Sequence, residues 1–253
     1  MNMIKTNNTD SSSRKLLMLS SGSSGNSSLK SQQFALIHEI YSTGYNGQKQ
    51  LLSVLLSRQD DPFVQISDVD GLIFELLRES KYNSILNDLN KFLASGIVAL
   101  NSAVGIDYSP LQQLLVTKQF QSADKLTQVL LCNLSQVNGR HDRKWLYFTD
   151  ISLMPTTDLL TIDKLWQVHS QGLFGLSVQR DIWLSTNSDW ETFWSKIGWK
   201  VNNVNCRYPN EFVWNVTAPP GHLPLFNQLR GVQVLAALFT HPAWDETSCK
   251  KSH

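Results

Sequence analysis

The residues best suited to chemistry in this sequence lie in one stretch without helical periodicity, between about 199 and 228. That stretch carries the aromatic residues Trp199, Tyr208, Phe212 and Trp214, interrupted by prolines. Disordered segments are poor in aromatic residues, and long loops in compact domains are usually functional or disordered. We therefore predict an ordered binding loop with aromatic faces available to a ligand.

The charges of this stretch indicate the kind of ligand it could hold. Lys200, Arg207 and Arg230 stand against Glu211 between residues 200 and 233, which leaves a net of two positive charges. Aromatic side chains can cover a flat apolar face, and arginines fork onto carboxylates. A planar, largely apolar ligand with two carboxylates would suit the aromatic residues and cations of this stretch. The composition alone fits ordinary core aromatics at least as well.

Signatures of catalysis are absent from the sequence. It contains no G-x-S-x-G elbow, no phosphate-binding G-x-x-x-x-G-K-[ST] loop and no H-E-x-x-H pair. Asp158 and Asp163 do not share a helix face, which disfavours an acid–base pair. His169 and His222 lack a ligand partner at helical spacing, and we interpret them as a helix-end cap and a turn residue. We predict no catalytic residue, no metal site and no cofactor of the protein's own.

Composition disfavours several further classes of protein. The net charge is +1 and no Lys/Arg cluster occurs at helical spacing, so nucleic acid is not predicted as a partner. The three cysteines are widely spaced, which argues against a disulfide framework and favours a reducing compartment. No stretch approaches the roughly 20 apolar residues that a membrane-spanning helix needs.

The elements that position the loop are predicted to be helices, because apolar residues elsewhere recur at helical spacing. Between residues 31 and 98 the pattern predicts a helical bundle, with a helix start at Ser67 and Asp68. Its acids, Asp70 and Glu79 among them, are interpreted as a solvated face, with a docking surface as the alternative. All eight tryptophans lie farther on, which marks a second domain over residues 101 to 247. The predicted fold class is all-α.

Residues 1 to 30 are rich in Ser, Asn and Gly and contain one acidic residue. Such a segment cannot bury enough apolar surface to offset its ordering entropy, so we predict a disordered tail. A Ser-rich, basic and acid-poor segment is also typical of an organelle transit peptide. Both interpretations stay open.

Four segments of the second domain, in this order, resemble one known family. They run from Gly105 to Leu111, from Trp145 to Thr149, from Leu165 to Arg180 and from Gly221 to Val232. Together they are similar to the genomes-uncoupled-four family, the tetrapyrrole-binding regulators of magnesium chelatase in cyanobacteria, algae and plants. Residues 31 to 98 resemble, more loosely, the extra helical bundle of the cyanobacterial and algal members.

The resemblance implies an all-α core shaped like a cupped hand that binds protoporphyrin IX and magnesium protoporphyrin IX. It implies a regulator that stimulates magnesium chelatase, acts with the large porphyrin-holding subunit of that enzyme, and associates peripherally with membranes. The implied location is the plastid (chloroplast stroma), or the cytoplasm of a cyanobacterium. The implied porphyrin-binding residues are Phe174, Val178, Arg207, Tyr208, Phe212, Trp214, Leu223, Leu225 and Arg230.

Two positions depart from the family's pattern. Tyr208 stands where close relatives carry a tryptophan, and Gln233 stands where they carry a second arginine, one turn after Arg230. A tyrosine keeps an aromatic face, so we expect porphyrin binding to survive. Loss of a cation should weaken the carboxylate contact or shift it onto Lys200.

Two other classes of function remain open from the sequence. One is a helical adaptor that docks proteins, holds no ligand and uses the aromatic residues as core. The other is a tetrapyrrole-modifying enzyme, which the missing catalytic signatures disfavour.

Overall fold

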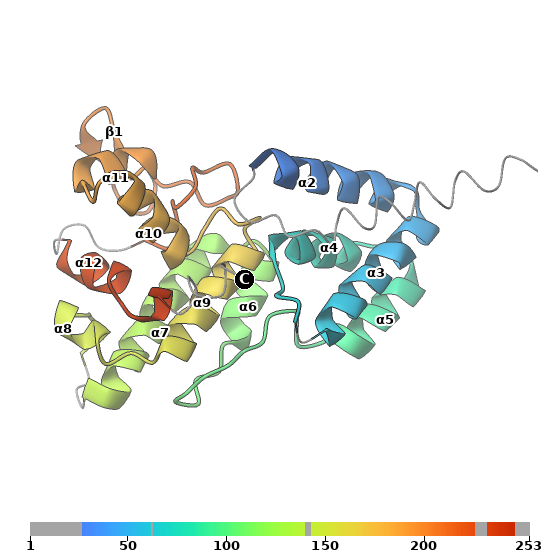
Figure 1. Ribbon diagram of the computed structural model, residues 1–253, viewed down its shortest axis with the longest axis horizontal. Helices are drawn as coiled ribbons and strands as arrows, with labels where there is room; N and C mark the ends of the chain where they lie inside the picture. The colour runs from blue at the N-terminus through green and yellow to red at the C-terminus, as the bar shows by residue number, and fades with distance from the viewer. Residues whose placement is uncertain (1–26, 62, 140–142, 226–231, 246–253) are drawn as a thin grey trace, which may run out of the picture. The chain divides into compact units, whose positions relative to one another are not determined.

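The computed structural model of the protein describes residues 27–61, 63–139, 143–225 and 232–245 (Figure 1). The chain divides into two compact units, with the break between Ile97 and Val98. Helices make up both units, and the only strands among the described residues form one short hairpin. The predicted all-α class is therefore confirmed. None of the described helices is both long and apolar enough to cross a membrane.

The first unit contains four described helices: α2 (Ser27–Ser42), α3 (Tyr45–Asp60), α4 (Asp68–Arg78) and α5 (Asn83–Leu93). Each of α3, α4 and α5 buries most of the apolar stripe that predicted it, although Phe92 of the α5 stripe is exposed, and α3 runs beside α5 in Figure 1. The predicted helix start is correct, because Ser67 is the N-cap of α4. Helix α2 begins at Ser27, so the end of the predicted tail is helical. Residues 1–26 lie outside the described residues.

The expectation of a solvated acidic face is wrong for Asp70, which is fully buried in the first unit. Its carboxylate accepts a hydrogen bond from Arg58 Nε at 2.6 Å and from the backbone N–H of Ser67 at 2.8 Å. The second contact completes a capping box at the start of α4. One acid therefore joins α3 to α4 while it caps a helix.

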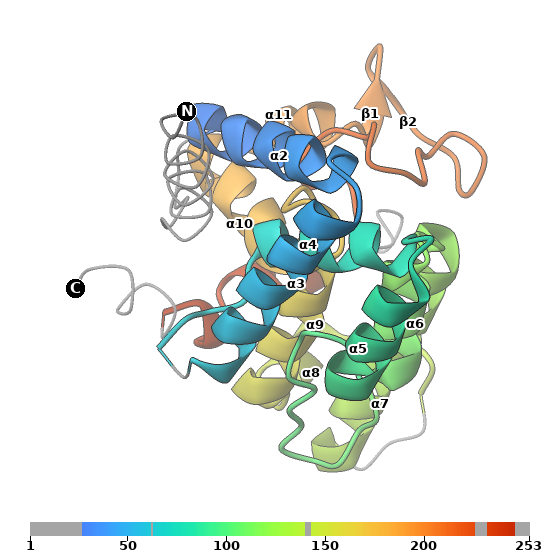
Figure 2. The same ribbon diagram turned by 90° about the vertical axis from the view of Figure 1, so that its right-hand side faces the viewer.

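The described elements of the second unit are α6 (Ser109–Val116), α7 (Phe120–Gly139), α8 (Phe148–Ile151), α9 (Thr156–Val168), α10 (Leu176–Ser185), α11 (Trp190–Lys196), β1 (Lys200–Val201), β2 (Val204–Asn205) and α12 (Gln233–Phe239). The longest described helix of the second unit is α7, with 20 residues, which packs against α6 and α8 (Figures 1 and 2). The predicted left-handed stop at Gly172 is correct, with φ of 68°. The hairpin turn at Asn202 and Asn203 also has positive φ at both residues, which asparagine tolerates.

Three aromatic rings form the centre of the second unit. Phe120 on α7 lies 6.0 Å from Trp166 on α9 and 5.4 Å from Phe174, measured between ring centroids. All three side chains are buried, and the Trp166 indole donates to Thr127 Oγ at 3.0 Å. The ring packing fixes α7 against α9 and against the segment that leads into α10.

A buried carboxylate connects the start of the second unit to α9. Asp158 accepts hydrogen bonds from Ser102 Oγ at 2.5 Å, from the Ala103 N–H at 2.9 Å and from the Tyr108 hydroxyl at 2.7 Å. Because Asp158 is fully buried, the hydrogen bonds from these three donors replace those that its carboxylate would form with water.

Replacing Asp158 by alanine should destabilise the protein, because the Tyr108 hydroxyl would lose its acceptor in a buried position. We expect the free energy of unfolding in urea to fall by about 3 kcal/mol or more, the cost of losing hydrogen bonds to a charged group. The control is Asp181→Ala, which removes an exposed carboxylate from α10. Equal stability of the two variants would contradict a structural role for Asp158.

Candidate functional site

Two of the motif segments noted in the sequence meet in the second unit. The Gly175 N–H donates to the carbonyl of Leu223 at 3.0 Å, and the Gly221 N–H donates to the carbonyl of Leu173 at 2.7 Å. The two segments thus bond through their backbones, although α10, α11 and most of the predicted loop separate them in the sequence. The loop that was predicted from its aromatic residues returns to this junction at Gly221 and Leu223.

Gln179 strengthens the junction from helix α10. Its amide nitrogen donates to the carbonyls of Gly221 at 2.9 Å and Pro224 at 2.7 Å, and the side chain is fully buried. Gly221 has φ of 77°, and a Cβ atom there would lie 2.8 Å from Ile182 Cδ1. A side chain at this position would therefore force the loop away from α10.

His222 holds the loop from the inside. Its Nδ1 lies 2.7 Å from the carbonyl oxygen of Ile197, and its Nε2 accepts the Val213 N–H at 3.1 Å. The two contacts assign the proton to Nδ1 and require a neutral ring. Burial lowers the pKa of His222, which the hydrogen bond to Ile197 opposes. The indole of Trp199 adds a bond to the His222 carbonyl at 2.7 Å.

Three rings of the loop form a row that ends at His222, and we call Tyr208, Trp214 and Phe212 the aromatic row. Tyr208 meets Trp214 edge to face at 5.9 Å, and Phe212 lies 6.3 Å from Trp214 and 5.5 Å from His222. The Trp214 indole donates to the Pro209 carbonyl at 3.0 Å. Tyr208 is 52% exposed, whereas the other two rings are half-buried.

The aromatic row approaches the first turns of α7. Asp124 on α7 is buried and accepts the Leu225 N–H at 2.7 Å, and burial raises the pKa of Asp124 to about 7. Burial and the nearby Asp124 carboxyl also raise the pKa of Tyr208, while the Gln121 side chain lowers it. Tyr208 and Leu225 therefore lie beside the same stretch of α7.

The cations of the loop differ in their surroundings. Lys200 forms an ion pair with Glu191 on α11. Arg207 is exposed, and its guanidinium makes no ion pair with any residue that the structure describes. The backbone N–H of Arg207 donates to Glu211 Oε2 at 2.8 Å. The guanidinium of Arg207 takes no part in this bond and is available to a ligand. Arg230 lies outside the described residues.

The predicted porphyrin-binding residues fall into two groups. Phe174 and Leu223 are fully buried and Leu225 is 7% exposed, so these three belong to the interior of the second unit. The aromatic row and Arg207 lie on the loop itself, and Val178 is half-buried on α10. Three residues that were not predicted as part of the site connect the groups: Asp124, Gln179 and His222.

The two acids that were considered as a catalytic pair have separate partners. Asp163 is buried and accepts the Ser177 N–H at 2.9 Å, so it caps the start of α10. Asp158 accepts hydrogen bonds from Ser102, Ala103 and Tyr108 at the start of the unit, as described above. Among the described residues no three His, Cys, Asp or Glu side chains lie together as a metal ion would require.

Comparison with known proteins covers the same region. A family model described as GUN4-like matches residues 101–242. The chain is 51% identical over 214 residues to the ycf53 protein of Pyropia yezoensis, which covers 85% of this chain and 90% of that protein. It is 39% identical over 146 residues to an Arabidopsis thaliana protein named "Tetrapyrrole-binding protein, chloroplastic", over 54% of this chain and 55% of that one. The solved structure of GUN4 from Chlamydomonas reinhardtii is similar at a TM-score of 0.53 and 37% identity, over 58% of this chain and 94% of that chain.

The neutral His222 ring makes the loop sensitive to acid. Because the pKa of His222 is lowered in the folded protein, the unfolded chain takes up the proton first. The stability from the neutral ring is complete above about pH 6.5, the ordinary pKa of histidine, and is lost as the pH falls below that value. We expect tryptic cleavage after Arg207 to accelerate between pH 7.5 and pH 5.5, after correction for the activity of trypsin on a peptide standard.

The variant His222→Leu should be cleaved rapidly at every pH, because both hydrogen bonds are gone. His38→Leu, which changes an exposed histidine of α2, should keep the wild-type profile. A wild-type cleavage rate that does not change with pH would contradict the role assigned to His222.

Proposed function

Because the chain belongs to the GUN4-like family, we propose that its second unit binds a tetrapyrrole and that the protein regulates an enzyme instead of catalysing a reaction. The observation that carries the proposal is the junction of segments 173–179 and 221–225, which holds the aromatic row beside α7. The region matched by the family model, residues 101–242, contains the junction and the row. The Arabidopsis relative, named for tetrapyrrole binding, supports the same ligand class.

The energetics of a flat ligand favour a site with both rings and cations. Burial of about 300 Å² of apolar ligand surface would contribute about 7.5 kcal/mol, against several kcal/mol lost in association. The free energy that remains after this subtraction supports weak binding only. Charged contacts to the ligand's carboxylates are therefore needed for micromolar affinity. Arg207, exposed at the edge of the loop, supports this requirement.

The specific ligands that we propose are protoporphyrin IX and magnesium protoporphyrin IX. Their macrocycle would lie against Tyr208, Phe212 and Trp214, over the layer of Phe174, Val178, Leu223 and Leu225. Their two carboxylates would meet Arg207 and Arg230. Tyr208 offers a smaller face than the tryptophan of close relatives, and its exposure leaves that face accessible.

The enzyme that we propose as the target is magnesium chelatase, through its large porphyrin-holding subunit. Delivery or retention of a tetrapyrrole by the second unit would stimulate magnesium insertion without a catalytic group in this chain. We place the protein in the plastid stroma, with peripheral association with membranes. The chloroplastic Arabidopsis relative supports the plastid assignment.

A ligand-free protein adaptor is the second candidate function. Exposed aromatic residues near α8 favour it, because Tyr147 is 51% and Phe148 is 50% exposed, next to Leu153 at 41%. Apolar side chains that gather on a surface are typical of protein contacts. A porphyrin titration separates the two candidates.

We expect protoporphyrin IX to quench the tryptophan fluorescence of the full-length protein and to shift its own Soret band, with saturation at a micromolar concentration. Trp214→Ala should weaken binding about tenfold, which corresponds to about 1.4 kcal/mol and to the loss of one ring contact. The control is Trp145→Ala, which removes a tryptophan outside the loop. A wild-type protein that neither quenches nor shifts would leave the adaptor as the better candidate.

The carboxylate contacts can be tested by charge. Arg207→Ala and Arg230→Ala should each weaken binding of protoporphyrin IX roughly tenfold, because each removes a charge-assisted hydrogen bond. Gln233→Arg, which restores the family's second cation, should tighten binding, more so at low salt. The dimethyl ester of the porphyrin should be insensitive to all three changes, and Lys196→Ala is the control. If Arg207→Ala and Arg230→Ala weaken binding of the ester as much as binding of protoporphyrin IX, the two arginines have a structural role and do not contact the carboxylates.

A further inference from the structure

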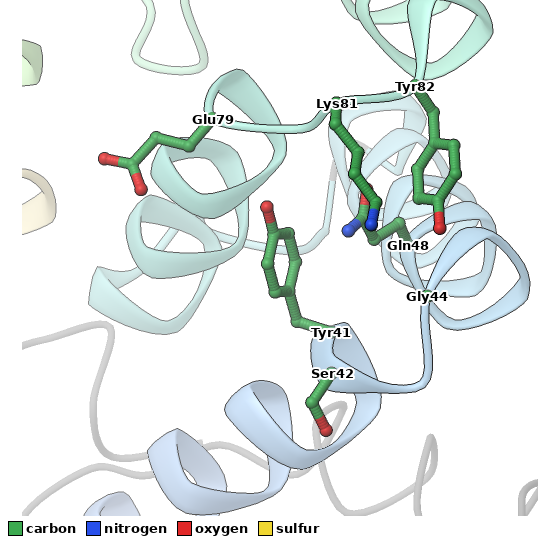
Figure 3. A pocket seen from close by; sticks show the side chains of 7 residues that line it. All are labelled: Tyr41, Ser42, Gly44, Gln48, Glu79, Lys81 and Tyr82. Carbon is green, nitrogen blue, oxygen red and sulfur yellow. The ribbon is translucent and has the colours of Figure 1, made fainter.

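A hollow of about 300 Å³ lies in the first unit, apart from every residue of the proposed tetrapyrrole site (Figure 3). It is enclosed by the end of α2, the start of α3 and the connection between α4 and α5. The side chains that matter for its chemistry are Tyr41, Gln48, Glu79, Lys81 and Tyr82. Its volume falls at the low end of known ligand pockets, which suits a small molecule.

Gln48 is the most constrained side chain of this hollow. It is only 4% exposed, and its Oε1 accepts the Ser80 hydroxyl at 2.5 Å. The Ser80 hydroxyl in turn accepts the Tyr82 N–H at 3.1 Å, which fixes the direction of the bond. The Gln48 amide nitrogen is thereby turned into the hollow, where it donates to no residue that the structure describes. This nitrogen can therefore donate to a molecule held in the hollow.

Further donors converge on the same space. Figure 3 shows the Lys81 ammonium on the same side as the Gln48 amide, facing Tyr41. Lys81 Nζ lies 5.6 Å from the centre of the Tyr82 ring and, within the described part of the chain, meets no carboxylate at ion-pair distance. Burial, followed by the nearby Glu79, raises the pKa of Tyr41, so the Tyr41 hydroxyl stays protonated and can donate.

The start of α3 lies beside the hollow, which Gly44 and Gln48 help to line. This helix of 16 residues begins after Gly44, has no side-chain cap and carries no acidic residue in its first turn. Its first N–H groups therefore lack partners of the kind that usually cap a helix, and the helix dipole favours an anion there. Gly44 has φ of 84°, and a Cβ atom at this position would lie 3.2 Å from the Tyr82 hydroxyl, so glycine keeps that hydroxyl at the helix start.

We propose that this hollow binds the phosphate group of a small phosphate monoester. The amide of Gln48, the ammonium of Lys81 and the hydroxyls of Tyr41 and Tyr82 are four donor groups around one hollow, and a tetrahedral anion can accept from donors in several directions. A phosphate presents three terminal oxygens, and lysine together with a helix N-terminus is a common setting for one. Glu79 also lines the hollow, but Figure 3 shows its carboxylate directed away from Lys81, where it can accept a hydroxyl of the organic part.

Isothermal titration of the full-length protein with glycerol 3-phosphate tests the proposal. We expect saturable binding of the monoester, weaker binding of inorganic phosphate and none of glycerol. Lys81→Gln should weaken monoester binding about tenfold, because it removes one charge-assisted contact. Lys91→Gln, which removes another lysine of the first unit that lies over Phe92 and outside the hollow, should bind like wild type.

A second variant addresses the buried amide. Gln48→Glu keeps an oxygen for Ser80 but replaces the donor with a negative charge, so it should abolish binding, while the melting temperature shows that the unit remains folded. The proposal is overturned if wild type shows no saturation up to about 10 mM monoester, a concentration that would largely fill a site with a dissociation constant of about 1 mM. It is also overturned if inorganic phosphate binds and the monoester does not, or if Lys91→Gln weakens binding as much as Lys81→Gln. Porphyrin binding should be unchanged in all three variants, so the outcome is independent of the proposed tetrapyrrole site.

Discussion

The second unit depends on one constraint above all others. The segment that leads into α10 must stay joined to the segment that ends the aromatic loop, although two helices, a hairpin and an irregular stretch lie between them in the sequence. Backbone hydrogen bonds between Gly175 and Leu223 supply part of the connection. Gln179 and His222 supply the rest, because each places a buried polar side chain among backbone groups that would otherwise lack partners. Burial makes these bonds costly to break, since a donor or acceptor left unpaired in the interior loses its water as well as its partner.

Buried carboxylates serve the same purpose elsewhere in the chain. Asp70 joins α3 to α4, Asp158 connects the start of the second unit to α9, and Asp163 caps α10. Each carboxylate accepts at least two hydrogen bonds, which compensates for the charge that burial removes from water. Burial raises the pKa of Asp163 and also that of Asp124, to about 7, and the Asp124 carboxylate accepts the backbone N–H of Leu225. The stability linked to this raised pKa is complete below the ordinary range of aspartate and is lost as the pH rises through about 7.

Periodicity alone was enough to predict most of the helices and the position of the loop. The apolar stripes, the cap at Ser67 and the stop at Gly172 are local signals, and each acts within one or two turns of chain. The roles of Asp124, Gln179 and His222 could not be predicted in this way, because their partners lie 101, 45 and 25 residues away in the sequence. A lone acid, amide or imidazole on a helix or turn looks the same whether it faces solvent or a buried carbonyl. For the same reason the sequence pattern placed Asp70 on a solvated face. The strands β1 and β2 are too short to produce a periodic pattern, so the sequence did not predict their hairpin.

The hydrogen bonds that His222 makes through both ring nitrogens also bear on the rates at which a ligand associates and dissociates. They hold the loop in place through contacts that belong wholly to the protein, so its order does not depend on a ligand. A molecule that meets such a preorganised surface loses little conformational entropy from the protein, and no refolding step limits its arrival. Association would then proceed at similar rates for related flat molecules. Selection among them would rest on how long each one stays, which is a property of the dissociation rate.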